Sequence, residues 1–152
     1  MGYDLDAYFD VDQDVVTAYI GEHNLDVNSW HDSDAIAQHF SNKLGWSKTH
    51  TISYAYNQQC NLHEFSASYP TSWIRDDDRF SNRRFKMYLA EKFGKPFPEC
   101  LENINWCLRT RKDALKVASA LDEFFYDDTE CGRFAEWLRE TAEFASTYEL
   151  SY

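Results

Sequence analysis

Residues 3–11 read Tyr-Asp-Leu-Asp-Ala-Tyr-Phe-Asp-Val and alternate between two kinds of side chain. One set is apolar and consists of Tyr3, Leu5, Ala7, Phe9 and Val11. The other set is mostly acidic and consists of Asp4, Asp6, Tyr8 and Asp10. A period of two is typical of a half-buried β-strand. We therefore predict a strand with one face on a core and its aspartates on the other face.

Two more alternating runs lie further along the chain. Residues 49–57 place Ile52, Tyr54 and Tyr56 on one face, and a run that Pro70 ends places Phe65, Ala67 and Tyr69 on one face. The turn between them, near 57–61, contains no glycine. The two runs predict a β-hairpin, even though the turn lacks the usual Asn-Gly signal.

The rest of the chain shows helical spacing of apolar residues. The helices are predicted between Asp12 and Gly21, between Ser33 and Gly45, from Asp76–Asp78 to Gly94, over 98–108, from Thr110 to Phe125, and through Phe134 to Ala145. Asp12 and Ser33 are expected N-caps, and Thr110 with Asp113 forms an expected capping box. The sequence thus predicts an α+β fold, predominantly helical, in which about six helices accompany a small antiparallel sheet of the N-terminal strand and the hairpin. At 152 residues without a recognisable linker, residues 1–152 are expected to form one globular domain.

Charge is distributed very unevenly along this chain. The net charge is −11, and nine carboxylates with no lysine or arginine precede Lys43, so the remaining residues carry only −2. Such a surface repels nucleic acids and anionic membranes and attracts basic surfaces or metal ions. Aromatic residues reach 17%, which argues for a packed core and against disorder.

Targeting signals and cysteines point to an intracellular protein. The N-terminus has neither a basic nor an apolar signal region, and no run of 18 apolar residues is present. Four irregularly spaced cysteines are present: Cys60, Cys100, Cys107 and Cys131. Reduced thiols in a cytoplasmic protein are the expectation.

The sequence contains several partial metal-binding patterns, and none of them is complete enough to assign a site. Asp4 and Asp6 form a D-x-D pair that can hold divalent metal for phosphoryl transfer if a third carboxylate, such as Glu64, converges on them. The alternative is a solvated face of an edge strand.

Two other patterns resemble metal sites only in part. Residues 10–14 imitate half of an EF-hand loop, but Val15 stands where that loop needs glycine. Cys60 and His63 have C-x-x-H spacing without a second close pair, so zinc is not expected, and no cofactor is predicted.

One basic stripe stands out in the middle of the sequence. On a continuous helix, Arg75, Arg79, Arg83 and Lys86 would fall within roughly 80° of one another. The stripe either grips phosphate or an acidic partner, or is a solvated face that pairs with the acidic residues of the chain itself. Direct nucleic-acid binding is not expected, because the stripe would work against the net charge.

Three functions remain open. The first is a non-enzymatic protein that docks a basic surface of another protein through an acidic N-terminal face at Asp4, Asp6 and Asp10, at the extreme as an inhibitor that mimics nucleic acid. The second is a structural or assembly subunit whose aromatic residues anchor interfaces, either in a homo-oligomer or in a larger complex. The third is a metal-dependent phosphoryl hydrolase. The absence of catalytic motifs ranks them in this order, and no catalytic residue is assigned.

Overall fold

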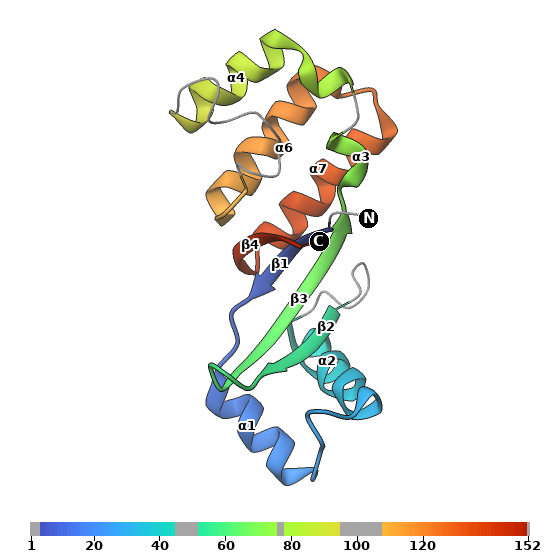
Figure 1. Cartoon of the computed structure of the whole chain (residues 1–152), viewed down its shortest axis with the longest axis vertical. Coiled ribbons are helices and arrows are strands. Elements are labelled where there is room, and N and C mark those ends of the chain that lie inside the picture. The colour runs from blue at the N-terminus through green and yellow to red at the C-terminus, as the bar shows by residue number, and fades with distance from the viewer. Residues whose placement is uncertain (1–3, 45–51, 76–77, 95–107, 152) are drawn as a thin grey trace. The chain divides into compact units, whose positions relative to one another are not determined.

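The computed structural model describes residues 4–44, 52–75, 78–94 and 108–151 (Figure 1). Its elements in chain order are β1 (Asp4–Phe9), α1 (Gln13–Glu22), α2 (Trp30–Leu44), β2 (Ile52–Asn57), β3 (Leu62–Pro70), α3 (Ser72–Arg75), the 3-10 helix η1 (Asp78–Ser81), α4 (Arg83–Phe93), α6 (Arg111–Phe125), α7 (Thr129–Ala142) and β4 (Ala145–Ser151). The predicted α+β class, mainly helical with a small antiparallel sheet, is confirmed. The chain groups into two compact units, a smaller unit (Tyr8–Ser68) and a larger unit (Met1–Ala7 and Tyr69–Tyr152).

The sheet has the strand order β2-β3-β1-β4. The predicted alternation of β1 is confirmed, because Leu5 and Ala7 are fully buried while Asp4 is exposed. The suggestion that β1 is an edge strand is wrong, since β4 lies on its far side. The aspartates of β1 therefore do not protect a free sheet edge.

The smaller unit is built around the predicted hairpin, which pairs β2 with β3 from Ile52↔Ala67 to Asn57↔Leu62. Two asparagines replace the expected glycine in its turn. The Asn57 side chain accepts from the amides of residues 59 and 60, and Asn61 adopts a left-handed φ of 52°. Asparagine tolerates both roles better than most residues, so the turn closes without glycine.

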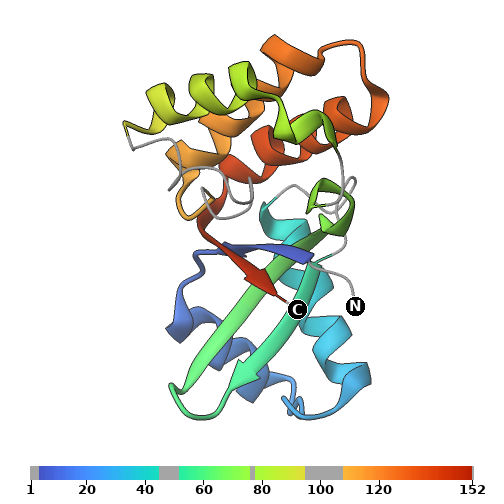
Figure 2. The same ribbon diagram turned by 45° about the horizontal axis from the view of Figure 1, so that its top comes forward.

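Helices α1 and α2 cover one face of the hairpin (Figures 1 and 2). Phe40 of α2 packs edge-on against Phe65 of β3, and Thr17 of α1 reaches His63 on the same face of that strand. The two helices are joined by Tyr19, whose ring stacks on His39 with centroids 4.0 Å apart. The opposite face of the hairpin carries the alternate side chains of β2 and β3, which are mostly polar.

The starts of these two helices differ in how well the sequence predicted them. Asp12 is the N-cap of α1, as expected, and accepts from the amides of Asp14 and Val15. The predicted start of the second helix at Ser33 is wrong, because α2 begins at Trp30. Ser29, four residues earlier, accepts from the Asp32 amide and offers an equivalent capping hydroxyl.

Helices α4, α6 and α7 form most of the described part of the larger unit, and aromatic side chains fill its core. One cluster joins η1, α4 and α6 through ring contacts among Phe80, Phe85, Phe124 and Phe125. A second cluster joins Tyr69, Phe134, Trp137 and Tyr148. The predicted capping box at the start of α6 is present, with the Thr110 and Asp113 side chains each accepting from the backbone of the other.

Two predicted helices of the larger unit need correction. The helix expected from 76–78 to Gly94 is wrong in its first part, since α4 begins only at Arg83 with Asn82 as its N-cap. The last helix ends at Ala142 instead of Ala145, and the chain turns into β4. Pairing within the sheet explains β4, and local periodicity cannot reveal a partner so distant in sequence. The helix predicted over 98–108 lies outside the described residues, apart from its last position.

Among the described residues, none of the helices combines the length and the apolar character needed to cross a bilayer.

Candidate functional site

The smaller unit carries a strong excess of carboxylates. Its sequence holds eight carboxylates against two lysines, a net charge of −6, and only Lys43 of those lysines lies in the described part. Most of the carboxylates occupy exposed positions on α1, on α2 and in the loops beside them. We call the group the acidic surface of the smaller unit, and it consists of Asp10, Asp12, Asp14, Glu22, Asp26, Asp32 and Asp34.

No carboxylate of this acidic surface forms an ion pair within the described residues. Four of the carboxylates make local hydrogen bonds: Asp12, Asp26, Asp32 and Asp34. Asp10, Asp14 and Glu22 are exposed, and their side chains have no such bond in the described part. Mutual repulsion among like charges destabilises a compact state. The helix dipole favours Asp14 in the first turn of α1, but it opposes Glu22 at the last residue of that helix.

The three aspartates predicted as a binding face are not placed alike. Asp4 and Asp6 lie on the same face of β1 and belong to the larger unit. Asp4 is exposed, whereas Asp6 is partly covered and engaged in an interaction. Asp10 follows the end of β1 in the loop to α1 and belongs to the smaller unit. The strand thus brings two of the three together.

The metal hypotheses find no assembled ligand set. Among the described residues, no group of three or more His, Cys, Asp or Glu side chains could hold a metal ion. Cys100 and Cys107 lie outside the described residues, whereas Cys60 is exposed and Cys131 is buried. The aspartates that imitated an EF-hand loop are accounted for by the end of a strand and a capped helix.

A buried polar network between α1 and the hairpin was missed as a unit by the sequence reasoning. His63 is buried on β3, and its ring nitrogens lie 2.6 Å from the Tyr54 hydroxyl and 3.1 Å from the Thr17 hydroxyl. Its backbone is held as well, because the Gln13 amide accepts from the His63 N–H at 2.7 Å and donates to the His63 carbonyl at 2.9 Å. Position 63 lies on the same face of the strand as its buried apolar residues, so the alternation along the sequence was the signal that His63 is buried.

The hydrogen bonds of this network define one proton arrangement. The Thr17 hydroxyl donates to the Gln13 carbonyl at 2.9 Å, so it accepts from Nε2–H of His63. The other nitrogen, Nδ1, is then the acceptor for the Tyr54 hydroxyl. Both ring nitrogens of His63 are occupied, which leaves no lone pair for a metal shared with Cys60.

Burial sets the protonation of this network. Removal from water lowers the pKa of His63 below its usual 6.5, and the two hydroxyls that contact its ring, from Thr17 and Tyr54, carry no negative charge that would raise it again. Burial also raises the pKa of Tyr54 to about 12, with a further contribution from the neighbouring Tyr56. The neutral forms of both side chains are therefore the stable ones near neutral pH.

The predicted basic stripe does not exist as one helix face. Arg75 lies in α3, Arg79 in η1, and Arg83 and Lys86 in α4. Arg83 is exposed, while Lys86 is partly covered and engaged in an interaction. The break at Asn82 separates the first two positions from the last two.

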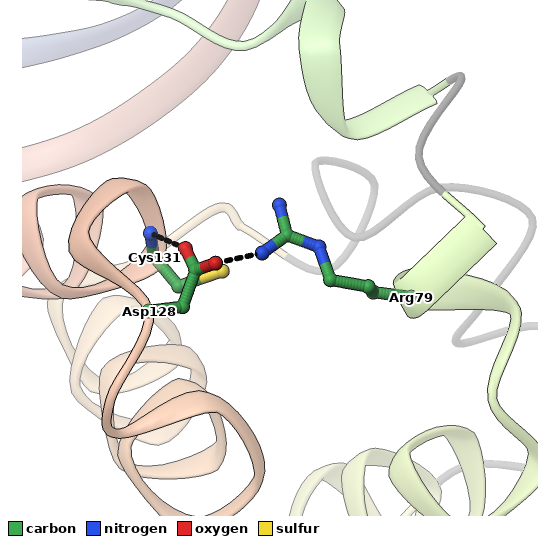
Figure 3. Close-up of polar contacts among 3 residues, drawn as sticks. All are labelled: Arg79, Asp128 and Cys131. Carbon is green, nitrogen blue, oxygen red and sulfur yellow. Dashed lines mark hydrogen bonds and ion pairs between the residues drawn. The ribbon is translucent and has the colours of Figure 1, made fainter.

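Arg79 forms an ion pair with Asp128, the N-cap of α7 (Figure 3). Asp128 also accepts from the Cys131 amide at 2.8 Å. That amide bond is the main cause that lowers the pKa of Asp128, and the Arg79 guanidinium lowers it further. Arg79 thus pairs with an acidic residue of the same chain, which favours a structural role for this part of the stripe.

Few large apolar side chains are exposed in the described part, but two aromatic ones are extreme. Trp30 at the start of α2 is 84% exposed, and Tyr126 after α6 is 79% exposed. Exposed aromatic residues of this size often anchor contacts with other proteins.

Family models, curated proteins and solved structures were all compared with this chain, and no match was found.

Proposed function

We propose that this chain is a non-enzymatic binding protein that docks a basic surface of another protein. The observation that supports this proposal is the acidic surface of the smaller unit, which forms no ion pair within the described residues. A binding partner with lysines and arginines would supply the missing counter-charges and would be steered towards this surface. At the extreme, such a protein is an inhibitor that occupies a nucleic-acid-binding groove.

The test is affinity capture from the source cell with the whole chain as bait, followed by mass spectrometry. The test variant carries Asp10→Asn, Asp14→Asn and Glu22→Gln, because these exposed side chains support no hydrogen bond in the described part. The matched control neutralises three exposed carboxylates of the larger unit through Glu123→Gln, Glu136→Gln and Glu143→Gln. A second test variant carries Asp4→Asn and Asp6→Asn.

We expect a basic protein that the wild type and the control retain and the Asp10/Asp14/Glu22 variant loses. Loss with the Asp4/Asp6 variant as well would extend the docking surface to β1. Equal retention by the Asp10/Asp14/Glu22 variant and the control would contradict the proposal, because the three residues would then carry no special share of binding.

A structural or assembly subunit is the second candidate, and the exposure of Trp30 favours it. Most described aromatic side chains take part in the core clusters, so aromatic content alone gives this candidate little support. Sedimentation of wild type and Trp30→Ala at high concentration tests it. A complex that dissociates in the variant supports self-assembly, and a monomer in both removes it.

A further inference from the structure

Within the described residues, no strand lies beside the outer edge of β2. β2 stands at one end of the sheet order, and β3 is its neighbour. In an antiparallel pair, every second residue turns both its N–H and its C=O away from the neighbouring strand. Beyond the pairing with β3, residues 52–57 make no backbone hydrogen bond to the described part of the chain. The edge therefore presents a row of backbone donors and acceptors.

The sequence of β2 also lacks the residues that commonly guard such an edge. Proteins commonly guard sheet edges with charged residues, proline or a covering segment. The sequence Ile-Ser-Tyr-Ala-Tyr-Asn of β2 contains neither a charge nor a proline. At the other end of the sheet β4 is partly covered, because the Tyr148 amide donates to the Arg109 carbonyl at 3.0 Å and Thr147 bridges to Thr110.

We infer that the outer edge of β2 binds an extended basic segment of a partner protein, which adds a fifth strand to the sheet. This inference rests on the proposed function and specifies the form of the partner. Main-chain hydrogen bonds would supply affinity, and side chains of alternate residues would supply specificity.

Charge complementarity comes from the face of the hairpin opposite α1 and α2. Ala55 pairs directly with Glu64, and both side chains lie on that face. A residue of an added strand opposite Ala55 would stand two strand spacings, about 10 Å, from Glu64. A lysine or arginine there can lay its aliphatic stem across the small Ala55 side chain and bring its charge to the Glu64 carboxylate.

A second copy of this chain fits the same edge less well. Its own β2 would offer no cation to Glu64, since the strand is uncharged. It would also bring together two smaller units that each carry a net charge of −6. Repulsion between them opposes such a dimer at low salt.

The experiment titrates the whole protein at low salt with a synthetic peptide of alternating lysine and valine and follows the backbone amide NMR signals. We expect the largest shifts in β2. A peptide of the same sequence with N-methyl groups on alternate residues keeps the charge but cannot pair as a strand, and we expect it to bind at least ten-fold more weakly.

Matched variants locate the docking site. Ala55→Lys places a cation on the route to Glu64, and we expect it to weaken binding of the unmethylated peptide about ten-fold. Ser119→Lys adds the same charge at an exposed position of α6 in the larger unit and is the control, with an expected change below two-fold. Glu64→Gln removes the anion but keeps a side-chain oxygen that can accept from Asn57 at the end of β2, and we expect an intermediate loss.

The outcomes separate this inference from the proposed function. Equal binding of both peptides, or shifts confined to α1 and α2, would overturn the edge site and leave an acidic docking surface in place. Failure of any basic peptide to bind would remove support from both. A dimer in sedimentation that Ala55→Lys dissociates would show that a second copy occupies the edge, and would overturn the inference.

Discussion

The two units of this molecule differ in how their charges are paired. The larger unit holds two ion pairs in its described part, Arg79 with Asp128 and Arg139 with Asp122. In the smaller unit, the carboxylates of the acidic surface have no ion pair within the described residues. Ion pairs of the first kind stabilise the chain itself. Carboxylates without such pairs can instead form ion pairs with the basic side chains of a partner.

Their cores differ as well. The larger unit packs α6 and α7 with aromatic rings, with Phe134 and Phe85 almost fully buried. The smaller unit relies in part on polar contacts, since Gln13, Thr17 and His63 join α1 to the hairpin. Aromatic packing tolerates changes of pH, whereas the polar network depends on the protonation of His63.

The largest expected effect comes from the aromatic core of the larger unit. Phe134 is fully buried and contacts the rings of Tyr69, Trp73 and Trp137. Phe134→Ala should lower the free energy of unfolding by about 3–5 kcal/mol in urea titration, because it leaves a cavity. Leu115→Ala on the exposed side of α6 is the control. A loss below that of the control would contradict the assigned core.

The next effect comes from the polar network of the smaller unit. Tyr54→Phe removes the hydroxyl that donates to Nδ1 of His63 and leaves a buried acceptor without a partner. We expect a loss of about 1–3 kcal/mol in the free energy of unfolding. Tyr56→Phe is the matched control, because the Tyr56 hydroxyl bonds to Asn61 at the exposed turn. Equal losses in the two variants would show that the buried bond has no special weight.

Changes of pH should separate the units further. The pKa of His63 is lowered by burial, and that of His39 is lowered by burial, Lys43 and His23, so the unfolded chain binds protons more readily at these sites. Their contribution to stability is complete above pH 6.5 and falls as the pH drops through the lowered values. NMR titration of the histidines checks this directly. A His63 pKa at or above 6.5 would contradict the assigned network.

At high pH the two units should behave alike. Burial raises the pKa of Tyr54 in the smaller unit and of Tyr148 in the larger unit to about 12. Stability held by these neutral hydroxyls is present below pH 10 and is lost as the pH rises towards 12. Ultraviolet titration of tyrosinate in wild type, Tyr54→Phe and Tyr148→Phe should show the late-titrating groups disappear one at a time.

The smallest effect tests whether the acidic surface is kept at a cost to stability. Glu22 ends α1, where the helix dipole disfavours negative charge, and the last turn holds no basic residue. Glu22→Gln should therefore raise the free energy of unfolding by a few tenths of a kcal/mol at low salt. The gain should shrink at high salt. Destabilisation by this change would show that Glu22 has a structural role.

Much of the fold follows from local patterns in the sequence. The alternation of β1 and the hairpin runs, the Asp12 cap and the capping box at Thr110 all depend on neighbours within a few residues. β4 does not, because its strand identity comes from the sheet that receives it. The cap of α2 was predicted at Ser33, whereas the Ser29 hydroxyl, four residues earlier, accepts from the Asp32 amide.

The candidate site was less accessible to sequence reasoning. The excess of carboxylates was visible at once, but their lack of ion pairs depends on where lysines and arginines fold. The sequence indicated His63 only through its zinc-like spacing from Cys60. The polar network was not predictable, because the partners of the His63 ring, Thr17 and Tyr54, come from two other elements. The open edge of β2 needed the strand order of the whole sheet.

The central claim is that the acidic surface of the smaller unit is a docking surface for a basic partner. The most direct test is the dissociation constant of the captured partner at about 0.1 M and about 1 M salt, where the screening length falls from roughly 10 Å to roughly 3 Å. We predict a large loss of affinity in high salt for wild type and a much weaker salt dependence for the Asp10/Asp14/Glu22 variant. An affinity that barely changes with salt, or the same salt dependence in both proteins, would contradict the claim.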